Sequence, residues 1–219
     1  YENMNNEDKE KLLKERDSIA FSLMSDLYKN AQKELDFKDE KIESIDCTEK
    51  DRMPKEEKEK YDEIGTEKIK AGKLAVVTMA GGQGTRLGHS GPKGTYTLNV
   101  GKEMSLFEIL CKTLKEAKEK YGVYVHWYIM TSKENNKETV EFFEKNNYFN
   151  YPKEKVTFFI QGELPMVGLD GKLLVDENGF VKLASDGHGG VFESMDKSGV
   201  LEQMKNEGIE WVFVGGVDN

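Results

Sequence analysis

Glycines and cations close together in residues 74–94 could hold a polyphosphate. Gly81, Gly82 and Gly84 follow a short apolar run, and Arg86 and Lys93 come soon after them. Glycine lets the backbone approach a ligand closely, and successive backbone N–H groups in such a turn form a concave anion site. The two cations would add fixed positive charge, so this segment predicts a polyphosphate ligand.

The glycine spacing differs from both common nucleotide-binding motifs. A P-loop needs Lys after its last glycine, and here Thr85 follows the cluster. The dinucleotide motif G-x-G-x-x-G fails because the glycines stand at 81, 82, 84 and 88, and a dehydrogenase would also need a ribose-binding acid after a second strand. A plain packing turn is the alternative, but it has no need of Gln83, Arg86 and Lys93 together.

Strands and helices alternate after residue 73, and this order predicts how the glycine-rich segment is held. Strands are expected at 74–79, 123–131, 156–161 and 210–217, and helices from 105 onward, at 134–145 and at 191–206. Ser105 and Glu108 form a capping-box pattern at the start of the first helix. The alternation indicates a mostly parallel sheet covered on both faces, with ligands at the carboxyl ends of its strands.

The first part of the chain differs in pattern, and we expect a helical N-terminal region at 1–72 before a nucleotide-binding part at 73–219. Apolar residues recur at helical steps over 9–33, between solvated charges. Pro54 begins a second helical pattern, with Gly65 as a breaker. We assign no chemistry to this region.

Composition argues against several classes of partner. The formal net charge of −9 disfavours nucleic acid and anionic membranes as main partners. No signal peptide and no apolar run long enough to span a bilayer are visible. Cys47 and Cys111 lack metal-ligand spacing, so we expect two free thiols in a cytoplasmic protein.

The motif AGGQGTRLG followed by PKG resembles the signature of the UDP-sugar pyrophosphorylases, especially the eukaryotic-type UDP-N-acetylhexosamine pyrophosphorylases. Met79 replaces the Leu of that signature, and the spacing to Lys93 is kept. WYIMTS, FFIQGELP, SDGHGG and GGVDN resemble later family blocks in the same order, from about Tyr61 to Asn219. The resemblance implies an α/β, Rossmann-like sheet of the nucleotide-diphospho-sugar transferase type. Because family members are far longer, we expect an incomplete domain that covers their N-terminal portion.

The resemblance also implies which residues bind the nucleotide. They are Met79, Ala80, Gly81, Gly82, Gln161 and Gly187. An amide with donors and an acceptor suits the edge of uracil, so Gln161 would read the base. A strand-end glutamine that bonds only to backbone is the alternative.

Four further residues would act on phosphates and metal. Arg86 and Lys93 would be the catalytic cations, His188 would bind the sugar phosphate, and Asp218, closing a buried strand, would bind Mg²⁺ through oxygen. A helix N-cap is the alternative for Asp218, and a turn histidine without chemistry for His188. N-acetylhexosamine enzymes usually carry Asn where this chain has His188, while glucose-1-phosphate and broad-specificity relatives often have G-H-G, so the sugar stays open.

The reaction that the resemblance implies joins UTP and a sugar 1-phosphate to give UDP-sugar and pyrophosphate, with Mg²⁺ as cofactor. No nucleophile paired with a base is visible, so positioning and charge stabilisation would carry catalysis. The alternative is a truncated, inactive UTP-binding module, since part of the family's site would lie beyond residue 219. The sequence leaves the oligomeric state open.

Overall fold

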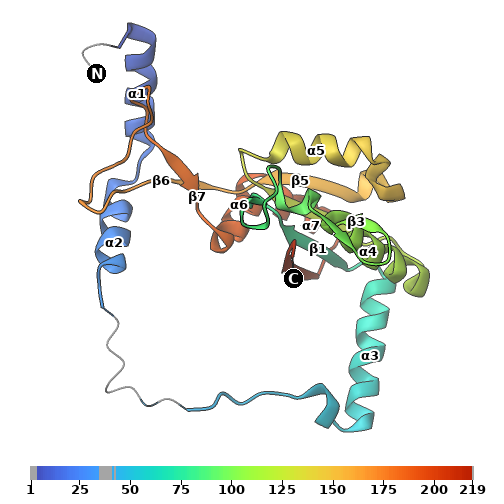
Figure 1. Ribbon diagram of the computed structural model, residues 1–219. Helices are drawn as coiled ribbons and strands as arrows, with labels where there is room; N and C mark the ends of the chain where they lie inside the picture. Colours follow the sequence, from blue (N-terminus) through green and yellow to red (C-terminus); the bar gives the residue numbers. More distant parts are fainter. Residues whose placement is uncertain (1–3, 35–40, 42, 219) are drawn as a thin grey trace. The chain divides into compact units, whose positions relative to one another are not determined.

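The computed structural model describes residues 4–34, 41 and 43–218 (Figure 1). The chain forms two compact units, one of Tyr1–Cys47 with Glu163–Ser185 and one of Thr48–Gly162 with Asp186–Asn219. Helix α3 (Lys55–Lys70) therefore groups with the larger unit. The predicted functional division after residue 72 stays a prediction, and residues 1–3, 35–40, 42 and 219 of the predicted regions lie outside the described residues.

A four-stranded parallel sheet forms the centre of the larger unit (Figure 1). Strand β1 (Leu74–Met79) pairs in parallel with β4 (His126–Thr131) on one side and with β8 (Trp211–Gly216) on the other. Strand β5 (Val156–Ile160) pairs in parallel with the far side of β4. The predicted parallel sheet is confirmed, and the carboxyl ends of its strands meet at one edge.

Helices cover both faces of this sheet. They are α4 (Leu106–Tyr121), α5 (Asn136–Lys145), α6 (Val191–Lys197) and α7 (Val200–Asn206). Trp127 and Ile129 of β4 pack in one core cluster with residues of α4 and α5. Tyr128 and Met130 pack in a second cluster with residues of α6 and α7. Successive side chains thus enter opposite layers, and β4 is buried over its whole length, as expected of a central parallel strand.

Three predicted helices differ in extent. The stretch predicted as one helix at 191–206 is two, because the chain turns at Gly199, where φ is +77°. The stretch 9–33 is also two helices, α1 (Asn6–Ser18) and α2 (Phe21–Ala31). Gly65 does not break α3, since an interior glycine costs a helix only about 1 kcal/mol.

Shorter elements connect these parts. A hairpin of β2 (Thr97–Asn99) and β3 (Glu103–Ser105) leads into α4. In the smaller unit, β6 (Glu163–Pro165) pairs with β7 (Leu183–Ser185) in antiparallel fashion. Single 3-10 turns are η1 (Lys50–Arg52), η2 (Thr85–Leu87), η3 (Lys93–Thr95), η4 (Asn147–Asn150), η5 (Lys153–Lys155) and η6 (His188–Gly190).

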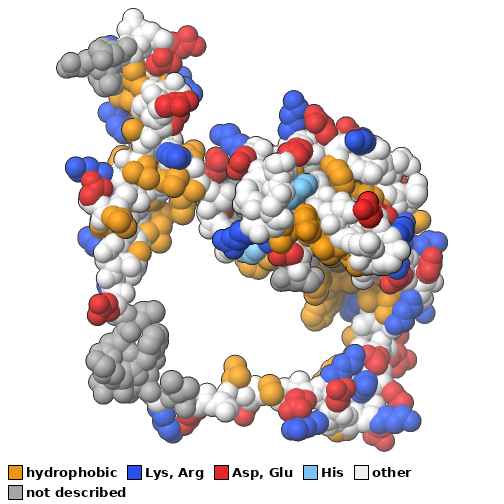
Figure 2. Space-filling model, in the orientation of Figure 1, with side chains coloured by type: hydrophobic (Ala, Val, Ile, Leu, Met, Phe, Trp, Pro, Cys, Tyr) orange, Lys and Arg blue, Asp and Glu red, His pale blue; other side chains and the backbone are white. Residues whose placement is uncertain are grey.

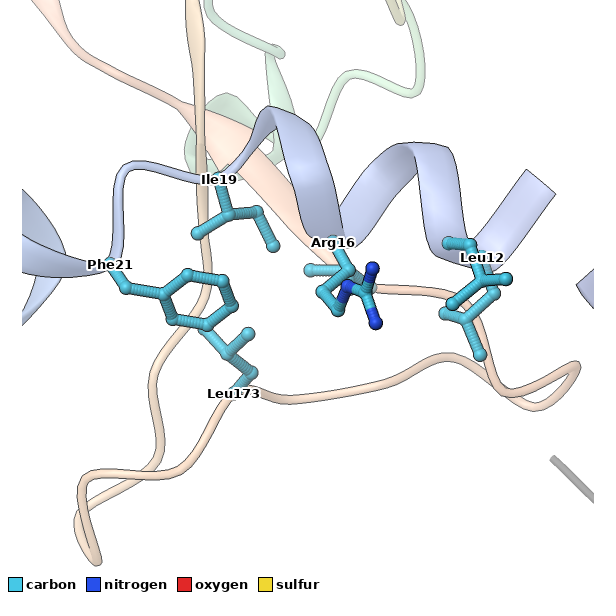
Figure 3. A pocket seen from close by; sticks show the side chains of 7 residues that line it. Leu12, Arg16, Ile19, Phe21 and Leu173 are labelled. Carbon is cyan, nitrogen blue, oxygen red and sulfur yellow. The ribbon is translucent and has the colours of Figure 1, made fainter. Parts of the chain in front are cut away.

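The smaller unit has an apolar groove of about 450 Å³ between its helical part and the 163–185 segment. Figure 3 shows Ile19 and Phe21 on the helical side, with Leu173 on the facing segment. Hydrophobic side chains also gather at the surface over β6 and β7 in Figure 2. Within the described ranges, no helix is both long and apolar enough to cross a membrane.

Candidate functional site

The loop that follows β1 is folded back by its own backbone. We call residues 80–94 the glycine loop. Gly84 N donates to Gly91 O at 2.9 Å, and Lys93 N donates to Gly82 O at 3.0 Å. These two bonds place the backbone of Lys93 beside the glycine-rich start of the loop.

Three successive backbone donors in the glycine loop have no partner within the described part of the chain. They are the N–H groups of Gly81, Gly82 and Gln83. Backbone donors that are left unpaired by the protein are available to an anion, and successive ones form a concave anion site. The geometry supports the polyphosphate site expected from the sequence.

Met79 and Ala80 hold the start of the loop in the sheet. Met79 O accepts from Val217 N at 3.1 Å, and Ala80 N donates to Met130 O at 2.7 Å. Ala80 is fully buried. The sheet therefore uses these backbone groups, and nucleotide binding by the two residues stays a prediction.

Gln161 lies directly against the glycine loop. Its backbone N–H donates to Thr131 O at 2.8 Å, and the residue is only 6% exposed. A Cβ at Gly81 would lie 2.6 Å from the Nε2 and Oε1 atoms of Gln161, so only glycine fits there without displacing the amide. The Gln161 amide itself makes no hydrogen bond with the described residues, which leaves its donors and acceptor for a ligand.

Lys93 and Asp218 contact one another across the strand ends. The Lys93 Nζ atom lies 2.6 Å from Asp218 Oδ2. This hydrogen bond holds the pKa of the Asp218 carboxyl below its usual range, so the group is ionised at neutral pH. Two predicted site residues, 125 positions apart in sequence, are thus paired with each other.

The expectation that Asp218 closes a buried strand is wrong. Among the described residues, strand β8 pairs with β1 alone and is an edge strand, and its Trp211 and Phe213 are 59% and 62% exposed. Asp218 itself is exposed, so no burial cost demands a metal. No group of three or more His, Cys, Asp or Glu that could hold a metal occurs in the described residues. A single exposed carboxylate still fits Mg²⁺, which usually takes one or two carboxylates together with substrate phosphates.

The second glycine-rich turn lies at the end of the same sheet. Gly187 has φ +80° and ψ −173°, a region open in practice only to glycine. His188 is exposed and close enough to Asp218 to help lower the pKa of its carboxyl. Contact of Gly187 with a nucleotide and of His188 with a sugar phosphate stays a prediction.

Arg86 is another predicted site residue of the glycine loop. It lies in η2 of the glycine loop, is exposed, and makes no hydrogen bond or ion pair with a described residue. Its guanidinium therefore remains available to a ligand phosphate, and its catalytic role stays a prediction.

Two polar residues at the strand ends were not singled out from the sequence. Asn135, fully buried in the turn after β4, bonds to the backbone of the glycine loop. Asp186 packs against Gly162 and Gly190, where added side chains would collide with its carboxylate, and burial raises its pKa. The Ser132-x-x-Asn135 pattern, with side chains able to bond to nearby backbone, was the available signal for Asn135.

Comparisons with known proteins identify the family of this chain. Residues 21–219 match the family described as UTP–glucose-1-phosphate uridylyltransferase. UDP-N-acetylglucosamine diphosphorylase 2 of Arabidopsis thaliana is 41% identical over 176 residues, which is 75% of this chain and 35% of that protein. The Saccharomyces cerevisiae UDP-N-acetylglucosamine pyrophosphorylase is 39% identical over 163 residues, 73% of this chain and 34% of the yeast protein.

Solved structures give the same answer for the fold. The UDP-N-acetylglucosamine pyrophosphorylase of Trypanosoma brucei, in complex with an inhibitor, has a TM-score of 0.65 at 32% identity and matches 74% of this chain and 35% of that one. The UDP-glucose pyrophosphorylase of Leishmania major has a TM-score of 0.59 at 20% identity, and the match covers 68% of this chain and 32% of that one. At this identity it supports the fold alone. The chain spans about a third of the length of these relatives. The match extends over most of the chain, and the chain belongs to the UTP–glucose-1-phosphate uridylyltransferase family.

Proposed function

We propose that the protein is a uridylyltransferase that makes UDP-sugar and pyrophosphate from UTP and a sugar 1-phosphate. The substrate would be N-acetylglucosamine 1-phosphate or glucose 1-phosphate. The observation that carries the proposal is the glycine loop. Three of its N–H groups have no partner among the described residues, its Gly81 lies against Gln161, and its Lys93 reaches Asp218. Family membership and the named relatives support it.

In this proposal the chain acts by positioning and charge. The N–H groups of Gly81, Gly82 and Gln83 hold phosphate oxygens, and the Gln161 amide pairs with the edge of uracil. Arg86 and Lys93 offset the negative charge that grows on the α-phosphate and on the departing pyrophosphate. The sugar phosphate oxygen attacks the α-phosphorus in line, and no covalent intermediate with the protein forms.

Asp218 is the residue that would hold Mg²⁺. A bound Mg²⁺ would neutralise phosphate charge and orient the phosphates for the displacement. Movement of the Lys93 ammonium toward a phosphate would weaken its contact with Asp218 and leave more of that carboxylate available to a cation.

Replacement of Lys93 tests this function. In the full-length protein, Lys93→Ala is expected to lower turnover by about 10²–10³-fold, the usual cost of one transition-state donor. Pyrophosphate release is measured with UTP and each of the two sugar 1-phosphates. Lys102→Ala is the matched control, because Lys102 lies close in sequence but pairs with Glu108 at 3.3 Å. Near-normal turnover of Lys93→Ala, with the control unaffected, would reject the assigned role.

A UTP-binding module without turnover is the second candidate. It concerns the 219 residues by themselves, which cover about a third of the length of these relatives. Calorimetric titration of the 219-residue chain with UTP and Mg²⁺, beside a pyrophosphate-release assay on the same sample, separates the two. Binding without release supports the module, and release supports the enzyme.

A further inference from the structure

We propose that Asn135 is a positioning residue that sets the direction of the phosphate-binding N–H groups in the glycine loop. The proposal rests on the proposed function, since it concerns the same polyphosphate site. Asn135 has no exposed surface and lies in the turn between β4 and α5, outside the glycine-rich motif. Its side chain nevertheless reaches two carbonyl groups of the glycine loop.

The partners of the Asn135 side chain leave only one orientation for its amide. The Oδ1 atom accepts from Ser132 N at 2.8 Å, and a backbone N–H can only donate. The Nδ2 atom donates to Ala80 O at 3.1 Å and Gly82 O at 3.3 Å, and carbonyl oxygens can only accept. Reversing the amide would set oxygen against oxygen and nitrogen against N–H, so the orientation follows from chemistry.

These two bonds determine where the free N–H groups of the loop point. A peptide unit is planar and trans, so its C=O and the N–H of the next residue point in opposite directions. With Ala80 O and Gly82 O turned toward Asn135, the N–H groups of Gly81 and Gln83 are directed away from it. Asn135 thereby fixes two of the three donors that would meet phosphate.

The contact of Asn135 with Gly82 O also involves the backbone of Lys93. Gly82 O accepts from Lys93 N at 3.0 Å as well as from Asn135 Nδ2. One carbonyl therefore joins the turn after β4 to both arms of the glycine loop. A buried anchor of this kind keeps a site in its binding geometry before the ligand arrives, which lowers the entropy cost of binding.

The experiment compares Asn135→Asp with Asn136→Asp in the full-length protein. Aspartate keeps an oxygen for Ser132 N but loses the two Nδ2 donations. The Asn136→Asp change adds the same charge one residue away. Among the described residues, the Asn136 side chain forms a hydrogen bond only with Thr131, whose Oγ1 donates to its Oδ1 at 2.8 Å. Asn135→Ala removes the donations without adding charge. Affinities for UTP and for uridine are measured by NMR titration, and thermal unfolding verifies that each variant is folded.

Loss of two hydrogen bonds is expected to weaken UTP binding by about ten- to hundredfold in both Asn135 variants and to leave uridine binding within about twofold. If the role were purely structural, the affinities for UTP and for uridine would fall together, and this result would overturn the proposal. UTP binding by Asn135→Ala equal to that of the wild type would also overturn it. Amide exchange gives a readout that needs no ligand. Faster exchange of the Lys93 N–H in Asn135→Asp, but not in Asn136→Asp, supports the role, and equal rates overturn it.

Failure of the proposed function gives a different result. The wild-type protein would then bind no UTP, whatever the exchange rates. In that case the amide exchange of Lys93 alone decides whether Asn135 sets the conformation of the loop.

Discussion

The contact between Gly81 and Gln161 shows why a single missing side chain matters at the site. The Gln161 amide lies where a Cβ at residue 81 would be, and the residue is almost fully buried. Space for the Gln161 amide, at the end of β5, is therefore created by the absence of a side chain at Gly81, just after β1.

Gly81→Ala is expected to destabilise the larger unit by about 1–3 kcal/mol, because the methyl group must displace a buried amide. Urea unfolding followed by tryptophan fluorescence measures the effect, since Trp127 and Trp211 both lie in the sheet. Gly82→Ala is the control, because nothing lies within 4 Å of its added Cβ. Equal stability of the two variants would contradict the close contact.

Candidate site residues could be selected from the sequence where type and spacing were both distinctive, and their chemical roles stay predictions. Lys93 and Asp218 were selected individually, and the structure pairs them. That pairing was not predicted, because it joins positions that only the sheet topology brings together. Asn135 was missed for a related reason: its side chain bonds to backbone carbonyls of the glycine loop, and the local Ser132-x-x-Asn135 pattern does not indicate that distant partner.

At the scale of elements, α4 begins where its sequence predicts. Ser105 is the N-cap of α4, and its Oγ accepts from Glu108 N at 3.1 Å. Phe107, in the first turn, is fully buried, so the cap also sets the position of a core side chain. The side chain of Glu108 lies against Lys102, so half of the predicted capping box is confirmed.

Ser105→Ala is expected to cost about 1 kcal/mol of stability, because Glu108 N loses its acceptor at a buried position. Ser105→Asp keeps an acceptor at the N-cap and serves as the matched variant. Denaturant unfolding compares the two, and a loss in Ser105→Asp as large as in Ser105→Ala would show that packing rather than capping is responsible.

The four strands of the parallel sheet could be predicted from the sequence, whereas the short strands β2, β3, β6 and β7 were not predicted and helix ends were less accurate. Apolar runs identify buried strands because both faces of a parallel strand are covered. Helical periodicity continues across a short turn, so the breaks at Gly199 and at Ile19 were not recognised. The opposite error at Gly65 arose because one interior glycine is only a weak breaker, and α3 continues through it.

At the scale of the larger unit, the buried His126 of β4 links this strand to β5 and to the C-terminal end of α7. Its Nδ1 lies 2.8 Å from Glu207 Oε2, and its Nε2 lies 2.9 Å from Thr157 Oγ1. Burial lowers the pKa of His126 below its usual value, and this effect exceeds the opposing attraction of Glu207. The neutral ring then donates from Nδ1 to the carboxylate and accepts the Thr157 hydroxyl at Nε2.

This lowered pKa predicts a pH-dependent stability. In the unfolded chain His126 binds a proton near pH 6.5, whereas in the folded chain it does so only at lower pH. The free energy of unfolding is therefore greatest above about pH 6.5 and falls as the pH decreases below it. Urea unfolding at pH 7.5 and 5.5 measures the change. His126→Gln is expected to reduce the pH dependence, and His188→Gln, at an exposed position, is expected to retain it. An unchanged dependence in His126→Gln would assign the effect to other groups.

The ion pair of Lys93 and Asp218 has a consequence for ligands of opposite charge. A phosphate that takes the ammonium of Lys93 frees the carboxylate, and a cation that takes the carboxylate frees the ammonium. Each ligand removes the competitor of the other, and such coupling is equal in both directions. We therefore expect an anion and a divalent cation to bind with positive cooperativity even where they do not touch one another.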